Sequence, residues 1–178
     1  MSDIIKLAAP LSEHAVRLLK AGDEVTVSGT VYTARDMAHQ RLCKLIDEGK
    51  KLPIELDGAI IYFVGPTPAR PGKAIGSAGP TTSARMDGFS PKLIAKGLRV
   101  MIGKGYRGQE VREAMKRHGA VHLAAVGGAG ALLSKHIAAS EVAAYEDLGT
   151  EAIRKLTLVD FPAIVAYDSD GNSIYKDK

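Results

Sequence analysis

Polar and β-branched residues alternate in the first third of the chain and then give way to a helical pattern. Residues 25–32 alternate with a period of two, which predicts a strand. Apolar residues then recur at helical spacing between positions 38 and 46. We therefore predict that the strand passes directly into a helix, with Thr33 as its N-cap, Asp36 completing an approximate capping box, and an end near Gly49.

The middle of the chain repeats short apolar runs, each followed by a glycine-rich turn and a helical pattern. Unbroken apolar runs of this length are typical of strands that are buried on both faces of a sheet. The predicted strands are 59–64, 99–102 and 120–126, and the predicted helices are 84–97, with a restart at Ser90-Pro91, 111–118, and a last one that ends near residue 136.

The C-terminal region predicts a β-hairpin. A strand at 161–167 is followed by a turn at 168–172 and a short partner strand at 173–175. Strands and helices that alternate between β-rich ends predict an α/β fold with a mixed sheet. A length of 178 residues with 46% hydrophobic content suits one compact unit, and we predict a single domain over residues 1–178.

Composition and charge narrow the classes of function. The formal net charge of +4 comes from 24 basic and 20 acidic residues, and the three Phe and six Tyr are not interleaved with the basic residues. We therefore expect no nucleic-acid partner. Residues 1–6 carry no export signal. No apolar stretch is long enough to cross a bilayer, so we expect a cytoplasmic protein without membrane segments.

Cysteine is nearly absent from the chain. Cys43 is the only one, so a single chain can build neither a disulfide framework nor an iron–sulfur or zinc site of its own. We expect no metal ligand in this chain, and any cluster has to come from a partner.

Arg35 stands at the predicted start of a helix, where the macrodipole makes a cation unfavourable unless an anion lies nearby. It is either an anion ligand or a solvated surface residue. His39 lies four residues later on about the same face and is either part of that site or a structural histidine. This junction is a candidate site because ligands usually bind at the carboxyl ends of strands in α/β sheets.

Two further junctions carry polar residues that a simple turn does not need. Residues 81–83 place three hydroxyls at a predicted helix start, with Arg85 one turn inside. A helix cap explains one of these hydroxyls more easily than all three. Lys104 stands between two glycines directly after a strand, where a ligand can approach closely.

Arg35, Arg85 and Lys104 together offer three cations with hydroxyls between them. Bidentate arginines match carboxylate geometry, so a small dicarboxylic acid held at both ends is the expected ligand. Such a site lacks an electrophile of its own. Arg70 is either a further ligand or a solvated residue. The glycine-rich turn at 127–130 fits a dinucleotide fingerprint poorly, and we expect a tight turn or a partner interface there.

Four ordered segments resemble the β region of class I fumarases and the related tartrate dehydratases. The segments are 28–39, 62–68, 76–87 and 101–105, and the similarity continues through 124–128 and 160–162. The resemblance therefore covers nearly the whole chain.

This resemblance implies a swivelling β/β/α domain that pairs with an α subunit. In the family, three cysteines of the α region hold a four-iron, four-sulfur cluster whose open iron acts as a Lewis acid on the substrate. By motif position, the substrate-binding residues are Arg35, Arg85 and Lys104, the catalytic residues are Thr81, Arg85 and Lys104, and the residues that support them from behind are Asp36, His39 and Thr82.

The activity implied is the reversible hydration of fumarate to malate, a hydro-lyase reaction of the tricarboxylic acid cycle. The chain would be inactive without its α subunit and would work in a homodimeric or α2β2 assembly. Two alternatives stay open. One is the β subunit of an L-tartrate dehydratase, and the other is a non-catalytic module that binds a dicarboxylate or docks to a partner.

Overall fold

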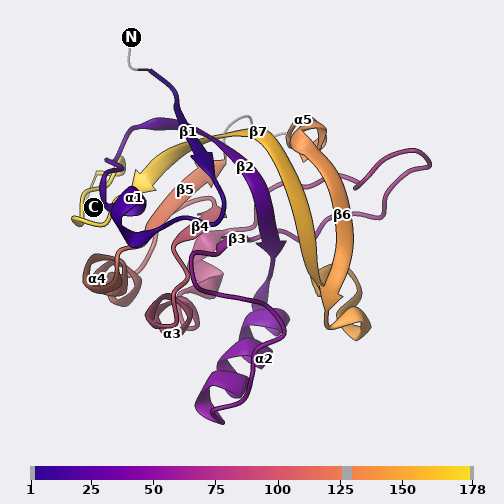
Figure 1. The fold of residues 1–178 in the computed structure, drawn as a ribbon, viewed down its shortest axis with the longest axis horizontal. Helices are drawn as coiled ribbons and strands as arrows, with labels where there is room; N and C mark the ends of the chain where they lie inside the picture. Colours follow the sequence, from indigo (N-terminus) through magenta and orange to yellow (C-terminus); the bar gives the residue numbers. More distant parts are fainter. Residues whose placement is uncertain (1–2, 126–129, 177–178) are drawn as a thin grey trace.

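The computed structural model describes residues 3–125 and 130–176 (Figure 1). In these residues the strands of one seven-stranded sheet are β1 (Ile5–Ala8), β2 (Glu24–Thr33), β3 (Ile60–Tyr62), β4 (Val100–Gly103), β5 (Val121–Ala125), β6 (Ile137–Ala144) and β7 (Ile153–Tyr167). The α-helices are α1 (Glu13–Arg17), α2 (Asp36–Asp47), α3 (Ser90–Ala95), α4 (Gln109–His118) and α5 (Gly130–Leu133). The 3-10 helices are η1 (Ser83–Met86), η2 (Ser134–His136) and η3 (Glu146–Glu151).

The sheet is mixed and closes on itself. Strands β1 to β5 pair in chain order and run parallel. The long strand β7 runs antiparallel to β2, β5 and β6. Because β7 joins β2 to β5, strands β2, β3, β4, β5 and β7 form a small barrel that β1 and β6 extend (Figure 1). The predicted α/β class with a mixed sheet is confirmed.

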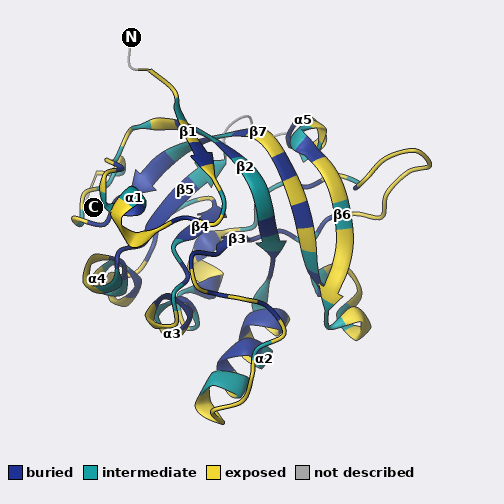
Figure 2. Ribbon diagram, in the orientation of Figure 1, coloured by how far each residue is buried: buried dark blue, intermediate teal, exposed yellow. Residues whose placement is uncertain are grey.

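The central strands are buried on both faces, which explains their unbroken apolar runs. Ile60 and Tyr62 of β3 pack with the other strands, whereas Ile61 and Phe63 pack with residues of α2, α3 and α4. Those three helices lie along one side of the sheet. The central strands have the interior of the barrel on one face and the helices on the other, and they are mostly buried (Figure 2). Each such side chain contributes about 1.5–3 kcal/mol when fully removed from water.

The middle elements match the prediction, with small shifts at their ends. The predicted helix at 84–97 consists of η1 and α3, and α3 restarts at Ser90 as expected. Helix α4 ends at Gly119, whose φ of 75° is the left-handed conformation typical of a C-cap glycine. The predicted hairpin is present as one antiparallel bridge between Tyr167 and Ser173. Most of the predicted glycine-rich turn at 127–130 lies outside the described residues.

The N-cap prediction for α2 is wrong. Thr33 is the last residue of β2, and Arg35 occupies the N-cap position without a side-chain cap hydrogen bond. The Thr33 hydroxyl instead donates to Ala152 O at 3.3 Å and accepts from Arg154 N at 3.0 Å. The hydroxyl therefore joins β2 to the start of β7, and Asp36, as the first helical residue, forms no capping box with it.

Five elements or parts of elements among the described residues have no counterpart in the prediction. These are β1, α1, β6, η3 and the first half of β7. Strand β6 lies at the edge of the sheet, is mostly exposed, and consists largely of Ala, Ser and Glu. Its pairing with β7 determines its conformation, because such residues have little intrinsic preference for strands.

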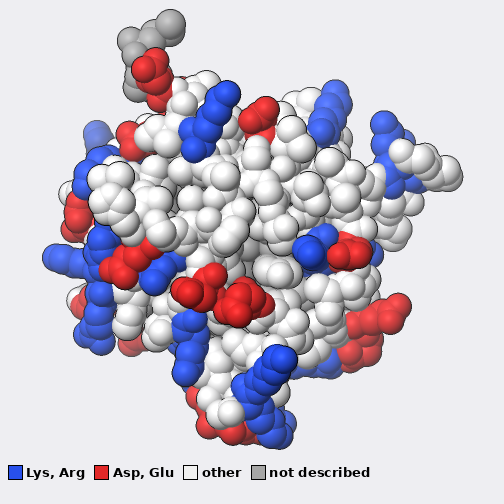
Figure 3. Space-filling view, viewed as in Figure 1, with Lys and Arg blue, Asp and Glu red and all other residues white. Residues whose placement is uncertain are grey.

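The surface shows no area of a single charge on the face drawn in Figure 3, where Lys and Arg side chains are mixed with Asp and Glu around a largely uncharged centre. None of the helices within 3–125 and 130–176 is long and apolar enough to cross a membrane.

Candidate active site

Three polar junctions meet at the carboxyl ends of neighbouring parallel strands. Arg35 follows β2 at the N-cap of α2, and Lys104 follows β4. Ala34 N donates to Tyr62 O at 3.1 Å, so the end of β2 lies against the end of β3. Thr81 N donates to Phe63 O at 2.7 Å, which returns the long loop after β3 to that same edge.

Thr82 and Lys104 lie directly beside each other. They form a parallel bridge, and Ser83 N donates to Lys104 O at 2.9 Å. Thr82 and Lys104 are exposed and Thr81 is half-buried. The structure shows no ion pair of the Lys104 ammonium with the described residues. The segment 81–83 therefore presents hydroxyls beside an accessible ammonium.

Arg85 is joined to the first junction by an ion pair. Its Nη2 donates to Asp36 Oδ2, which links η1 to the first turn of α2. The Arg85 side chain is 51% exposed and that of Asp36 is 29% exposed. A pair this exposed contributes little to stability, so a carboxylate ligand can replace Asp36 as the partner of Arg85 at small cost.

Arg35 is partly buried rather than fully solvated. Its Nε is buried and has no hydrogen-bond partner in the described part of the chain. The side chain lies across Gly65, where an added Cβ would be 2.9 Å from both Cδ and Nη1 of Arg35. An unpaired N–H of a guanidinium in such a position favours an anion nearby.

His39 supports Arg35 from behind. It is fully buried, and its Nδ1 donates to the Arg35 carbonyl oxygen at 2.8 Å. The ring lies between Phe63 and Phe89. Burial lowers the pKa of His39 to about 4, and the charge of Arg107 also lowers it. A neutral, fully buried histidine that donates to the Arg35 carbonyl oxygen has a structural role.

We expect the stability of the protein to fall as the pH drops from about 6.5 to about 4, in part because of His39. Over this range the unfolded histidine binds a proton that the folded one excludes. The contribution is about 3 kcal/mol in total, or about 1.4 kcal/mol per pH unit. Urea unfolding at several pH values measures how steeply the free energy of unfolding changes with pH. His39→Asn should lower this slope by about 1.4 kcal/mol per pH unit. An unchanged slope in the variant would contradict the assignment.

Two polar pairs behind the site, one fully buried and one with a buried arginine, were not singled out from the sequence. Ser83 Oγ lies 2.7 Å from His122 Nε2. Arg107 Nε donates to Asp87 Oδ1 at 2.8 Å, and the Arg107 side chain is fully buried. The partners are 39 and 20 residues apart in the chain. Among these four residues, only Ser83 was indicated by a local pattern, the hydroxyl run at 81–83. No local spacing in the sequence predicts which distant residues pair.

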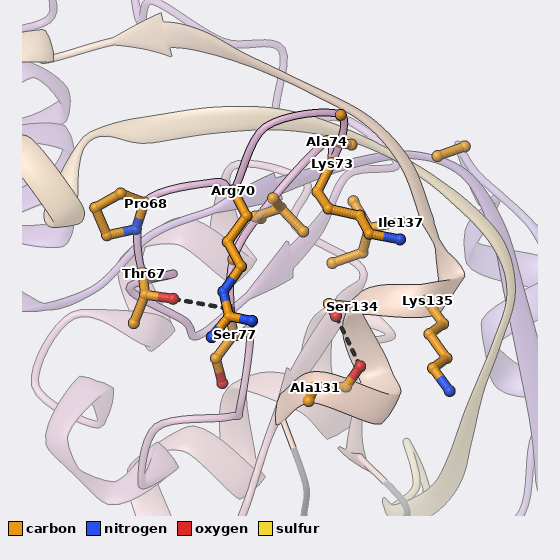
Figure 4. Close-up of a pocket in the computed structure, with 14 residues that line it drawn as sticks. Thr67, Pro68, Arg70, Lys73, Ala74, Ser77, Ala131, Ser134, Lys135 and Ile137 are labelled. Carbon is orange, nitrogen blue, oxygen red and sulfur yellow. Dashed lines mark hydrogen bonds between the residues drawn. The ribbon is translucent and has the colours of Figure 1, made fainter.

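A separate cavity of about 630 Å³ lies between the loop after β3 and the start of β6 (Figure 4). Its lining includes Arg70, Lys73 and Lys135, of which Arg70 was an open candidate. Figure 4 shows Arg70 pointing toward Thr67 and Ser77. The Ser77 N–H donates to Thr67 Oγ1 at 2.7 Å. Arg35, Arg85 and Lys104 do not line this cavity.

The residues of this chain do not suit an iron–sulfur cluster. Cys43 is buried in α2, and its Sγ contacts Phe89 O at 3.7 Å. Burial raises the pKa of its thiol, which disfavours the thiolate that a cluster requires. In 3–125 and 130–176, no group of three or more His, Cys, Asp or Glu side chains is placed to hold a metal ion.

Known proteins match this chain along nearly its whole length. The family described as "Fumarase C-terminus" matches residues 2–178. The aerobic class I fumarate hydratase of Escherichia coli (strain K12) is 37% identical over 173 residues, which are 96% of this chain and 31% of that protein. Fumarate hydratase 2 of Leishmania major is 36% identical over 97% of this chain and 30% of that protein.

A shorter relative matches over most of its own length. A Methanocaldococcus jannaschii protein named as the beta subunit of an L(+)-tartrate dehydratase is 38% identical, over 94% of this chain and 89% of that protein. The chain thus spans about a third of the fumarate hydratases it resembles and nearly all of this subunit.

Proposed function

Because the chain belongs to the Fumarase C-terminus family, we propose that it is the β subunit of an iron–sulfur hydro-lyase that converts fumarate to malate reversibly. Its relatives are named fumarate hydratase and tartrate dehydratase, so the chain belongs to a family of hydro-lyases. In this proposal it supplies the cations and hydroxyls that bind and orient the dicarboxylate.

One observation carries the proposal, namely that three junctions far apart in sequence converge on one edge of the sheet. The bridge of Thr82 to Lys104 and the ion pair of Arg85 with Asp36 connect these junctions. A dicarboxylate has two charged ends, and a guanidinium binds a carboxylate through two parallel hydrogen bonds. We assign Arg35 and Arg85 to the two carboxylates and Lys104 to additional charge stabilisation.

The chemistry demands cations that are already in place. Removing a proton from the carbon beside a carboxylate produces a dianionic aci-carboxylate, which only a preorganised positive site stabilises well. Arg85 and Lys104 supply that charge in our proposal. Thr81 moves the proton, and because a threonine hydroxyl is a weak base, it depends on the same cations to favour its alkoxide.

In this scheme Asp36 is the partner of Arg85 until the substrate binds. Before the substrate binds, its carboxylate accepts a hydrogen bond from Arg85. A substrate carboxylate would take over this bond, while Asp36 stays close enough to orient the guanidinium. His39 holds the backbone of Arg35, and Thr82 helps to position Thr81.

We assign the cluster to a partner α subunit, because this chain does not offer ligands for it. When bound there, the cluster would supply a Lewis acid. The relative named as a beta subunit supports a two-subunit arrangement. We further propose an α2β2 or homodimeric assembly in the cytoplasm, with this domain swivelling to close over the substrate.

Fumarate is the preferred substrate because the residues around Arg35 resemble those of fumarases. L-tartrate is the second candidate, and the M. jannaschii relative, which the chain nearly matches in extent, favours it. L-tartrate differs from malate, the hydrated form of fumarate, by one hydroxyl group and not by charge, so the same cations suit both.

We expect fumarate hydration only when the chain is mixed with an anaerobically prepared α subunit. Loss of fumarate absorbance measures the reaction, and each subunit alone is the control. Full activity of this chain alone would contradict the division of roles, whereas activity with L-tartrate only would establish the second candidate. Dicarboxylate binding by calorimetry, without recovery of a cluster-bearing partner, would favour a non-catalytic module.

A further inference from the structure

A buried hydrogen bond lies at the end of the hydroxyl segment, residues 81–83. Ser83 Oγ and His122 Nε2 are 2.7 Å apart, and both residues are fully buried. Ser83 is the first residue of η1, whereas His122 lies within β5, beyond the neighbouring strand β4. The bond therefore connects the segment to β5, the strand beyond β4.

The second nitrogen of His122 is buried as well. Its Nδ1 has no hydrogen-bond partner in the part of the chain that the structure describes. If Ser83 donates to Nε2, Nδ1 carries a buried N–H without an acceptor, and if Nε2 donates, the Ser83 hydroxyl proton is the one left without an acceptor. The same 2.7 Å bond joins the two residues in either tautomer.

The surroundings of His122 keep the ring neutral. Burial, together with the charge of Arg107, lowers the pKa of His122 well below its ordinary value. The ring also contacts Tyr167, at 5.8 Å between centroids. A ring that stays neutral keeps the same hydrogen bond to Ser83 across the neutral pH range and takes no part in proton transfer there.

The backbone of Ser83 is held on a second side by β4. Its N–H donates to Lys104 O at 2.9 Å, next to the bridge that Thr82 forms with Lys104. Gly103 leaves room for this approach, because a Cβ there would lie 2.1 Å from Ser83 Oγ. Ser83 is thus attached by its side chain to β5 and by its backbone to the end of β4.

We propose that Ser83 and His122 are positioning residues that hold the hydroxyls of Thr81 and Thr82 beside the Lys104 ammonium. This inference rests on the proposed function, since it concerns the same site. Ser83 is buried and does not reach the substrate itself. A group that moves a proton must be held within a fraction of an ångström of its working position, and two attachments at the adjoining residue provide that restraint.

Loss of the restraint should affect turnover more than binding, because Arg35 stands at the N-cap of α2, and Arg85, although it lies in η1 with Ser83, is also held by its ion pair with Asp36. In the reconstituted complex, we expect Ser83→Ala to lower kcat about 10- to 100-fold while KM changes by less than about threefold. An unchanged kcat would overturn the proposal. So would a large rise in KM at constant kcat.

Ser90→Ala is the matched control. Ser90 is equally buried, its hydroxyl donates to Met86 O at 3.0 Å, and it accepts from Arg107 Nη2 at 2.7 Å. Neither of these two hydrogen bonds involves residues 81–83. Ser90→Ala should therefore lower the melting temperature and leave kcat within about twofold. Equal losses of kcat in both serine variants would show a general stability effect and overturn the proposal.

Two substitutions of His122 separate positioning from packing. A glutamine places its amide nitrogen near the position of Nε2, whereas an asparagine places it near Nδ1. We expect His122→Gln to retain most of the turnover and His122→Asn to behave like Ser83→Ala. The opposite order would overturn the role of Nε2.

A measurement without turnover tests the pair separately. Nitrogen-15 spectra of the histidine rings in the full chain should show a neutral His122, and Ser83→Ala should shift its Nε2 resonance. A charged ring, or an Nε2 resonance that Ser83→Ala leaves unchanged, would overturn the pairing. If the spectra agree but the wild-type complex neither hydrates fumarate nor dehydrates L-tartrate, the proposed function fails and the catalytic role of the pair fails with it.

Discussion

Replacing Arg85 with alanine is expected to lower kcat/KM for fumarate by about 2–5 kcal/mol of transition-state stabilisation, or about 30- to 5,000-fold. The variant loses a charged hydrogen bond to the substrate. It also leaves the Asp36 carboxylate, which accepts from Arg85, without that partner and close to a dianionic substrate. Steady-state kinetics of the reconstituted complex measure the effect.

Arg41→Ala is the matched control for this substitution. Arg41 is also an arginine paired with an aspartate, since its Nη1 donates to Asp147 Oδ1 at 2.8 Å, but it lies in the second turn of α2 and outside the candidate site. We expect unchanged kinetics and a stability loss below about 1 kcal/mol. Wild-type kinetics in Arg85→Ala would remove Arg85 from the site, and Arg85→Lys should restore charge without the bidentate geometry.

Replacing Asp87 with alanine is expected to lower the free energy of unfolding by about 3–5 kcal/mol. Asp87 is the partner of Arg107, whose side chain has no exposed surface, so the variant leaves a guanidinium buried without its counter-charge. The Asp87 carboxylate also accepts a 2.7 Å hydrogen bond from Gly108 N before α4. Urea unfolding of the full chain measures the loss.

Asp47→Ala provides the comparison on the surface. Asp47 pairs with Lys92 at 2.5 Å, and the two side chains are 60% and 41% exposed. We expect a loss below about 1 kcal/mol, because exposed charges keep most of their hydration. Similar losses in the two aspartate variants would contradict the importance of burial for the Asp87–Arg107 pair.

The candidate site illustrates which parts of an active site can be predicted from a sequence. Arg35, Arg85 and Lys104 were candidates because each stands at a strand-to-helix junction, and junctions follow from local periodicity. The sequence left open whether His39 belongs to the site or to the core. The structure shows it buried between Phe63 and Phe89, with its proton donated to the Arg35 carbonyl oxygen.

Parts of the fold were missed for a related reason. Strand β6 and the first half of β7 form a pair in which the register runs from Ile137 opposite Leu158 to Ala144 opposite Ile153. Neither sequence has strong alternation, and each is stabilised as a strand mainly by the other. The Thr33 prediction failed because its hydroxyl joins β7, far along the chain, rather than the helix that follows it.

The sequence by itself determined the α/β class, the central strands and helices, the junctions that carry cations and hydroxyls, and the resemblance that the family match confirms. Each of these depends on residues close together in the chain. Only the tertiary structure decided that β7 closes the barrel, that Asp36 pairs with Arg85, and that His122 holds Ser83 from behind. Those contacts join residues tens of positions apart, and their geometry is set by how the sheet closes and how the helices pack on it, which no local pattern specifies.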